Sequence, residues 1–233
     1  MKAVIIAGGL GTRLRPVTYE MPKHLIPVQG KPFLEYTIET LKKGGVDEIY
    51  ISIGYLADKL KAHLGDGGKF GVKIHYLIED KPLGTGGWMN LVGRNDFKGD
   101  FVVLNGDDLC DIDIASFVAF HKKNKGLMTI ALKEIDNVKG FGVIELEGDK
   151  ISRFLYGQDA ENAASKCVSI GYYVFNEKIF DFLPDKEVVS LENDLQKVLA
   201  EKGLLYGFKT DAQWFGIGTF EIWERAIKEW RKK

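Results

Sequence analysis

The sequence predicts an α/β fold: a Rossmann-like open, mostly parallel sheet with helices on both faces and a small antiparallel subregion. Three observations support this prediction. The run Val4, Ile5, Ile6 is apolar without interruption, as in a strand buried on both faces of a parallel sheet. Strand and helix patterns alternate up to residue 78, and 233 residues with 45% hydrophobic content favour one large domain.

The first half of the chain gives a β-α-β-α-β order. A strand over residues 4–6 is followed by a helix over 34–41, whose apolar residues recur at helical spacing and which two glycines end. Alternating isoleucines predict a strand over 49–53, a helix over 56–64 follows, and 72–78 is the third strand. This order calls for right-handed crossovers and a parallel sheet.

The second half is less regular. Strands are expected at 101–104, 127–132, 141–146, 170–175 and 204–208, and helices at 114–121 and 191–198. Thr85 is a plausible N-cap for a short helix, and Ser190 can cap the helix over 191–198. Phe220, Trp223, Ile227 and Trp230 are expected to form the inner face of a closing helix.

Composition excludes several classes of function. The 32 lysines and arginines nearly cancel the 33 aspartates and glutamates, so no basic field points to nucleic acid or to a membrane surface. Cys110 and Cys167 are too few for a disulfide framework or a zinc site, which favours a reduced, cytoplasmic setting. No stretch approaches the ~20 apolar residues of a membrane span, and the N-terminal run is too short for a signal peptide.

A glycine-rich segment follows the first strand. Gly8, Gly9 and Gly11 let the backbone approach a ligand and turn its N–H groups inward, and Arg13 and Arg15 suit bidentate contact with phosphate oxygens. The segment therefore predicts a phosphate site at the carboxyl edge of the sheet, with a plain βα turn as the alternative.

Two common phosphate motifs do not fit this segment. The dinucleotide fingerprint G-x-G-x-x-G, started at Gly9, meets Leu14 where its third glycine belongs. The Walker loop ends in Gly-Lys-Ser/Thr, which is missing here. A redox enzyme with a dinucleotide cofactor is thereby disfavoured.

Carboxylates follow a later strand. Asn105-Gly106-Asp107-Asp108 comes directly after the apolar run 101–104, at the strand end where ligands bind in α/β sheets. Magnesium bridging a nucleotide is commonly held by one or two carboxylates plus phosphate oxygens. Gly-Asp-Asp alone is also an ordinary turn, so this pattern leaves both readings open.

Residues 3–34 closely resemble the signature of the sugar-1-phosphate nucleotidyltransferases. In that family a GGxGTRLxPxT loop precedes a Pro-Lys segment and a Gly-Lys-Pro helix start, and the resemblance recurs along nearly the whole chain. It implies a single nucleotidyltransferase domain over 1–233, with a nucleotide-binding half up to about residue 110 and a sugar-phosphate-binding half over about 111–233. The reaction it implies joins an NTP to a sugar 1-phosphate with Mg²⁺ and releases pyrophosphate.

The resemblance also assigns residue roles. Arg13 would hold the leaving phosphates, Lys23 would align the two phosphates that must approach each other, and Asp107 would bind the metal. Gly142 matches the family's Tyr-Gly-Val step, whose backbone lines the sugar pocket in the antiparallel subregion. The expected nucleotide contacts are Ala7, Gly8, Gly9, Gly11, Thr12, Glu79 and Gly84.

Residues 79–87 look most like the mannose- or heptose-1-phosphate guanylyltransferase lineage. Glu79 stands where thymidylyl- and uridylyltransferases of the family usually carry glutamine. A carboxylate only accepts hydrogen bonds, so it would suit the N1–H and amino donors of guanine, and GTP is the favoured nucleotide. A solvated surface glutamate is the alternative.

Three segments depart from the family pattern. Leu155 and Tyr156 replace a Glu-Lys pair whose lysine contacts the sugar phosphate, and Ser169-Ile170-Gly171 replaces Asn-Ala-Gly. Gly216 stands where Trp-x-Asp-Ile-Gly-Thr carries the second metal ligand. A catalytically impaired paralogue that binds nucleotide or nucleotide sugar and has a regulatory role is therefore the alternative to a transferase. The oligomeric state is left open, a homo-oligomer included.

Overall fold

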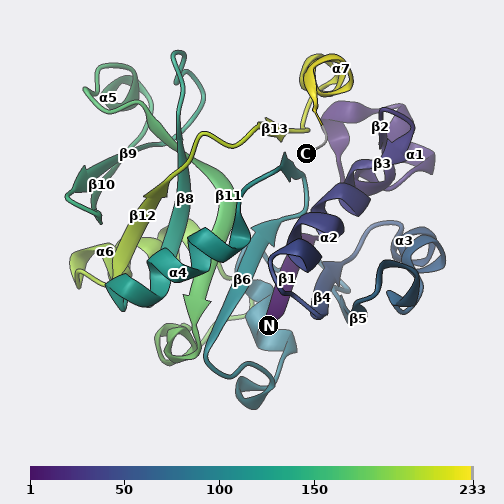
Figure 1. Ribbon diagram of the computed structural model, residues 1–233, viewed down its shortest axis with the longest axis horizontal. Helices are drawn as coiled ribbons and strands as arrows, with labels where there is room; N and C mark the ends of the chain where they lie inside the picture. Colours follow the sequence, from purple (N-terminus) through teal and green to yellow (C-terminus); the bar gives the residue numbers. More distant parts are fainter. Residues whose placement is uncertain (232–233) are drawn as a thin grey trace.

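The computed structural model describes residues 1–231 and contains one nine-stranded sheet and two short ribbons (Figure 1). The order in the large sheet is β5-β4-β1-β6-β11-β8-β12-β10-β9. Its strands are β1 (Lys2–Ala7), β4 (Glu48–Ile53), β5 (Lys73–Ile78), β6 (Asp100–Asn105), β8 (Met128–Glu134), β9 (Val143–Glu147), β10 (Lys150–Leu155), β11 (Cys167–Asn176) and β12 (Leu205–Lys209). The ribbons pair β2 (Pro27–Val28) with β3 (Lys31–Pro32), and β7 (Asp108–Cys110) with β13 (Trp214–Gly216).

The helices lie between these strands in the chain. The α-helices are α1 (Val17–Glu20), α2 (Phe33–Lys43), α3 (Ala57–Leu64), α4 (Ile114–Asn124), α5 (Gln158–Glu161), α6 (Lys197–Glu201) and α7 (Phe220–Glu229). The shorter turns used below are the 3-10 turns η1 (Thr12–Leu14), η2 (Lys23–Leu25), η4 (Gly87–Leu91) and η6 (Glu177–Phe182), and the π-helical turn η7 (Leu191–Gln196). No helix within residues 1–231 is both long and apolar enough to span a membrane.

Strands β5, β4, β1 and β6 form a parallel half-sheet, as the sequence predicts. The β1–β4, β4–β5 and β1–β6 pairs are all parallel. Val4 and Ile5 of β1 are fully buried because β1 has a strand on each side and a covered face above and below. The carboxyl ends of β1 and β6 therefore lie side by side at one edge of the sheet.

The other half of the sheet corrects the prediction of an open, mostly parallel sheet. Strand β11 is antiparallel to β6 and to β8, and β9 pairs with both β10 and β11, so strands β11, β8, β12, β10 and β9 close into a small barrel-like ring. Only Gly148 and Asp149 separate β9 from β10. A two-residue connection allows only antiparallel pairing, so β9 and β10 form a hairpin at the edge of the sheet.

Helices and turns cover both faces of the sheet. On one face α2, α3 and α4 pack through Leu34, Leu60 and Phe117. On the other face η4, η6, η7 and α6 pack through a second buried cluster that includes Trp88 and Leu199. This placement of helical segments on both faces confirms the α/β class.

The closing helix differs in part from its expected packing. Ala226 on α7 and Trp230 just beyond it are buried, but Phe220 is 43% and Ile227 41% exposed. The stripe predicted as the inner face is thus only half correct, because α7 lies at the margin of the molecule against the small cluster around Leu14 and Phe215.

Candidate active site

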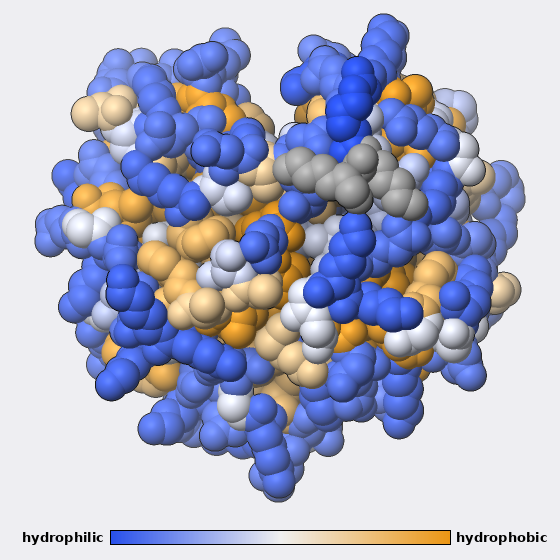
Figure 2. Space-filling view, viewed as in Figure 1, coloured by the Kyte–Doolittle hydropathy of each residue, from blue (hydrophilic) through white to orange (hydrophobic). Residues whose placement is uncertain are grey.

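A cavity of about 370 Å³ opens at the carboxyl ends of β1 and β6. It brings together most of the residues that the sequence assigns to the nucleotide. Its lining consists of Ile6, Gly8, Gly9, Gly11, Lys23, His24, Glu79, Pro82, Gly84, Thr85, Asn105 and Asp107. Both strands run upward in Figure 1, towards the notch between the lobe with α5 and the lobe with α7 that Figure 2 shows.

The glycine-rich loop is held against α1 and η2. Gly11 adopts a left-handed conformation, with φ 61°, and a methyl group there would lie 3.0 Å from the Thr18 side chain and 3.3 Å from that of Lys23. Thr18 Oγ1 donates to the Gly11 carbonyl at 2.8 Å. The loop therefore needs glycine at this position both for its backbone angle and for the close approach.

Lys23 and Asp107 form an ion pair at the centre of the lining. Lys23 Nζ lies 2.5 Å from Asp107 Oδ2, and Lys23 is buried. Burial alone would raise the pKa of Asp107, but the Lys23 ammonium outweighs it and holds that pKa below its usual value. The carboxylate is thus ionised and already in contact with a cation.

His24 lies beside this pair and is almost fully buried. Burial, and then the charge of Lys23, lower the pKa of His24 to about 4. The imidazole is therefore neutral at physiological pH, and the only cation of the η2 segment that faces Asp107 is Lys23.

Glu79 follows β5 and reaches the base of the glycine loop. Ser52 Oγ donates to its Oε1 at 2.5 Å, and the Leu83 N–H donates to its Oε2 at 3.3 Å. A methyl group at Gly8 would lie 2.8 Å from Oε1, so this carboxylate touches the loop directly. Each carboxylate oxygen has two lone pairs, so the group keeps acceptor capacity towards the cavity.

The loop after Glu79 is anchored to the segment before η7. Gly84 has φ 81°, and Leu83 and Gly86 each form a backbone hydrogen bond with Val189. Thr85 does not cap a helix as predicted. Its hydroxyl donates to Glu192 Oε2 at 2.8 Å and accepts from the Leu191 N–H, while η4 begins only at Gly87.

Three predicted nucleotide-side residues lie outside the cavity lining. Ala7 is buried at the end of β1, and Thr12 and Arg13 are exposed on η1. Arg13 leans on the loop after β13, since a methyl group at Gly218 would lie 2.8 Å from its Nη2. The guanidinium therefore lies beside Gly218, outside the cavity lining, with no hydrogen-bond partner among the described residues.

Gly142 lies in the other half of the molecule, away from the nucleotide cavity. A methyl group there would lie 2.7 Å from the ring of Tyr156, which is half exposed. Burial, and then the charge of Glu192, raise the pKa of Tyr156. Next to Gly142, the ring of Phe141 packs edge-on against Trp214 at 5.8 Å. The surroundings of Gly142 are therefore largely aromatic.

Asp108, the first residue of β7, faces β13. Trp214 Nε1 donates to its Oδ1 at 2.7 Å, and Asn105 is a further hydrogen-bond partner. Burial, and then the neighbouring charge of Asp107, raise the pKa of Asp108 well above its usual value. Its side chain thus turns towards β13, whereas that of Asp107 turns towards η2.

Sequence reasoning missed several lining residues. His24 and Asn105 both line the cavity, and so does Thr85, whose expected role was a different one. Asn105 was recoverable, because it is the last residue of β6 and the rule that places ligands at strand ends applies to it as to Asp107. The buried, neutral state of His24 has no signal in the sequence.

The donor set suits Mg²⁺ only with help from a substrate. No three His, Cys, Asp or Glu side chains gather into a metal cage within residues 1–231. Asp107 and Asn105 nevertheless offer the oxygen donors that Mg²⁺ prefers, and Mg²⁺ is usually held by one or two carboxylates plus phosphates. The Lys23 ammonium on Asp107 shows that this position accepts a cation.

A parallel half-sheet with a glycine loop, a lysine and a carboxylate at its carboxyl edge defines a nucleotide-binding α/β protein. A sequence model of the nucleotidyl transferase family matches residues 2–233, and the chain belongs to this family. The family recognised from residues 3–34 is therefore confirmed.

Relatives of known name point the same way. The chain is 34% identical to UTP–glucose-1-phosphate uridylyltransferase of Synechocystis sp. over 98% of its own length, but it spans only 63% of that relative. It is 33% identical to D-glycero-α-D-manno-heptose 1-phosphate guanylyltransferase of Aneurinibacillus thermoaerophilus, with 98% of each chain covered. The structure of HddC from Yersinia pseudotuberculosis in complex with GMP-PN superimposes with a TM-score of 0.81, at 28% identity and 99% coverage of each chain.

Proposed function

We propose that this protein transfers a nucleotidyl group from an NTP to a sugar 1-phosphate and releases pyrophosphate. The observation that carries this proposal is the single cavity in which the glycine loop, Lys23 and Asp107 meet at the carboxyl ends of β1 and β6. In this reaction an oxygen of the sugar phosphate attacks the α-phosphorus in line, while the bond from that phosphorus to pyrophosphate breaks. No covalent enzyme intermediate is needed, so positioning and charge neutralisation carry the catalysis.

The nucleotide half supplies the phosphate contacts. Backbone N–H groups of Gly8, Gly9 and Gly11 would bind the triphosphate, with Thr12 beside them. Arg13, exposed on η1, would hold the leaving phosphates and stabilise charge as it develops. Lys23 now donates to Asp107. With substrates bound, its ammonium would shift part of this contact to the two reacting phosphates and bridge them.

Asp107 would hold Mg²⁺, which when bound neutralises phosphate charge. Lys23 keeps this carboxylate ionised against the effect of burial, so it is ready to exchange one cation for another without a proton change. Glu79 would read the base. With Ser52 and Leu83 fixing its orientation, it would accept from the N1–H and amino group of guanine, which makes GTP the proposed donor.

The half from about residue 111 onward would hold the sugar phosphate. Gly142 and Tyr156 form one wall and the pair of Phe141 and Trp214 forms the next. Apolar ring faces beside a few polar groups are typical of ligand pockets. With tyrosine in place of the family's lysine, Lys23 is the cation left for the sugar phosphate.

Pyrophosphate release tests this proposal. The protein is assayed with Mg²⁺ against four NTPs, each with glucose, mannose and heptose 1-phosphates, and Asp107→Asn is the control variant. We expect release above background with at least one pair, highest with GTP, and loss of it in the control. Tight NTP binding without any release across the whole matrix would contradict transfer.

A second candidate function is a nucleotide- or nucleotide-sugar-binding paralogue without turnover. The observation that favours it is the simultaneous absence of a carboxylate at Gly216 and of a lysine at Tyr156. Calorimetric titration with GTP and with a GDP-sugar, run beside the turnover assay, separates the two. Binding of both ligands with no pyrophosphate release supports the paralogue.

A further inference from the structure

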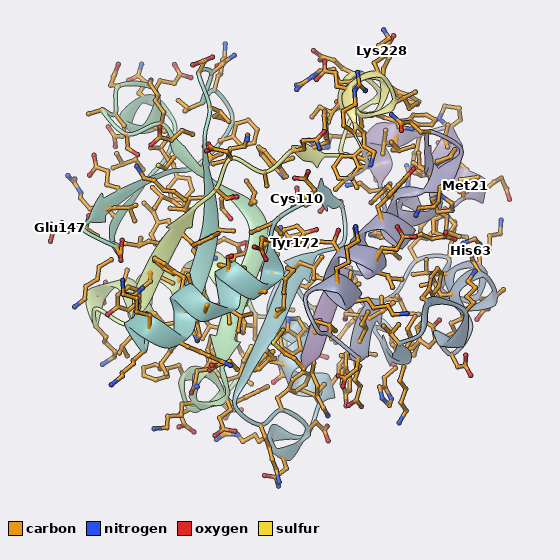
Figure 3. The ribbon with its side chains drawn as sticks, in the orientation of Figure 1. Met21, His63, Cys110, Glu147, Tyr172 and Lys228 are labelled. Carbon is orange, nitrogen blue, oxygen red and sulfur yellow. The ribbon has the colours of Figure 1, made fainter. Side chains whose placement is uncertain are left out.

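The Asp108 carboxylate occupies a niche that two glycines leave open. A methyl group at Gly171, whose φ is 73°, would lie 1.9 Å from Asp108 Oδ2, and one at Gly216 would lie 3.2 Å from Oδ1. Trp214 and Asn105 each form a hydrogen bond with this carboxylate. Figure 3 places the neighbouring Cys110 and Tyr172 near the middle of the molecule, and Tyr172 donates to the Asp108 carbonyl at 3.2 Å.

Asp108 and Gly216 are partners across the β7–β13 ladder. The register pairs Gly216 with Asp108 directly, and Trp214 with Cys110. Side chains of directly opposed residues stand on the same face of a ribbon about 5 Å apart. A carboxylate carried on β13 at position 216 would therefore begin beside the place that the Asp108 carboxylate now fills.

The charges of this region do not balance within the protein. Asp107 and Asp108 are adjacent, and Lys23 makes its ion pair with Asp107 alone. Among the described residues Asp108 has neutral hydrogen-bond donors but no cation in contact. Enclosing a second carboxylate beside a first is costly, and either a proton or a further positive charge relieves that cost.

We infer that Asp108 is the second carboxylate toward the divalent cation, supplied from β7 in place of the one that β13 lacks at Gly216. This inference rests on the proposed function. Together with Asp107 it gives a hard oxygen donor pair, and a carboxylate oxygen can accept the Trp214 N–H and still bind a cation through its other lone pair. Gly216 is then the residue that makes room for Asp108.

Manganese binding tests the inference without relying on turnover. Free Mn²⁺ is measured by electron paramagnetic resonance, with Mn²⁺ alone and with Mn²⁺ plus GTP. We expect Asp108→Asn to weaken Mn²⁺ about tenfold or more, as Asp107→Asn does. The exchange variant Asp108→Asn/Gly216→Asp should recover affinity to within about threefold, because it returns the carboxylate to β13. Thermal unfolding of each variant reports whether it is folded.

Two results would overturn the inference. One is wild-type Mn²⁺ affinity in folded Asp108→Asn. The other is a tenfold gain in Mn²⁺ affinity in Gly216→Asp, a variant that keeps Asp108. That gain would mean that position 216 is where the second ligand was missing. The calorimetric titration with GTP shows separately whether the wild-type protein binds the nucleotide. If it binds none, the proposed function fails, and the effect of Asp108→Asn on the binding of Mn²⁺ alone still decides the role of Asp108.

Discussion

Two pairs of carboxylates differ in their partners: Asp107 and Glu79 line the cavity, here called the nucleotide side, whereas Asp108 and Glu192 lie outside its lining, on the side proposed for the sugar phosphate. On the nucleotide side Asp107 is paired with Lys23, and Glu79 accepts from Ser52 and Leu83. On the sugar side Asp108 and Glu192 accept from neutral donors, Trp214 for the first and Thr85 and Ser190 for the second. Within residues 1–231 neither sugar-side carboxylate has a cation in contact.

This contrast teaches which half is complete before a ligand arrives. On the nucleotide side the protein's own groups already contact the carboxylates of Asp107 and Glu79. The protein therefore fixes the geometry there, and a triphosphate would exchange one set of contacts for another. On the sugar side the two carboxyl groups have only neutral donors from the protein, so they keep acceptor capacity for a cation or a hydrogen-bond donor from outside. Substitutions on the nucleotide side should therefore affect turnover, and those on the sugar side should affect substrate and metal affinity.

Removing Arg13 should have the largest effect. Charge stabilisation that grows towards the transition state is worth roughly 3 kcal/mol per donor, so Arg13→Ala should lower kcat about a hundredfold or more. Because Arg13 is exposed, the fold should be unaffected. Steady-state kinetics and calorimetric GTP binding check this. Arg15→Ala, a neighbouring exposed arginine, is the control, and equal losses in both variants would remove the special role of Arg13.

Acid should lower the stability of the folded protein through His24. Its folded pKa of about 4 lies below the usual value near 6.5, so between these pH values the unfolded chain binds a proton that the folded protein does not. Stability is therefore lost as pH falls from 6.5 towards 4, by up to about 3 kcal/mol for this group.

Urea unfolding at pH 7 and pH 5 measures this loss. His24→Gln should show a smaller decrease between the two pH values than the wild-type protein, whatever its stability at pH 7. His121 is also buried with a lowered pKa, so part of the decrease should persist in the variant. An identical decrease in both proteins would mean that His24 does not carry the acid sensitivity.

Much of this contrast could be predicted from the sequence, and the reasons differ by region. The parallel half-sheet and the grouping of Gly8, Lys23 and Asp107 followed from strand ends and from a long motif, both of which are local. The closed ring of β8 to β12 did not, because β9 pairing with β11 depends on segments some 25 residues apart. The exposure of Phe220 was missed because a helical stripe does not reveal which side of the helix has a neighbour.

The niche of Asp108 shows the limit most clearly. Alternation along an extended chain predicts that Asp107 and Asp108 point to different sides, but Asp107 lies in the turn before β7, where alternation does not hold. It cannot predict that Asp108 faces Gly216, since that requires the β7–β13 register. The departures at Tyr156 and Gly216 were visible in the sequence, but what surrounds them was not.

Exchanging Glu79 for glutamine should change base preference by about tenfold. The amide can keep its oxygen on the Leu83 N–H and present its NH₂ to Ser52, whose hydroxyl can also accept, so the loop should stay in place. One guanine donor then loses its acceptor, at about 1–2 kcal/mol. The ratio of kcat/KM for GTP to that for UTP measures this change. Equal use of both by the wild-type protein would contradict the assignment of Glu79.

The smallest and most diagnostic changes are two glycine substitutions, one in each half. A methyl group at Gly218 would lie 2.8 Å from Arg13 Nη2, and one at Gly142 would lie 2.7 Å from the Tyr156 ring. Neither glycine has a positive φ, so alanine fits the backbone at both sites. In each case the group that must move is a partly exposed side chain, so only a local displacement is expected.

The two variants should then separate by kinetic parameter. Gly218→Ala shifts the guanidinium and should lower kcat several-fold, with the KM for the sugar phosphate unchanged, since small displacements of a positioned group are costly to turnover. Gly142→Ala shifts the Tyr156 ring and should raise the KM for the sugar phosphate two- to threefold while kcat at saturation stays the same. Both are measured with each substrate varied in turn, beside thermal unfolding as a control for folding. If Gly142→Ala instead changed the KM for the NTP alone, Tyr156 would belong to the nucleotide side and the division of the cleft would be wrong.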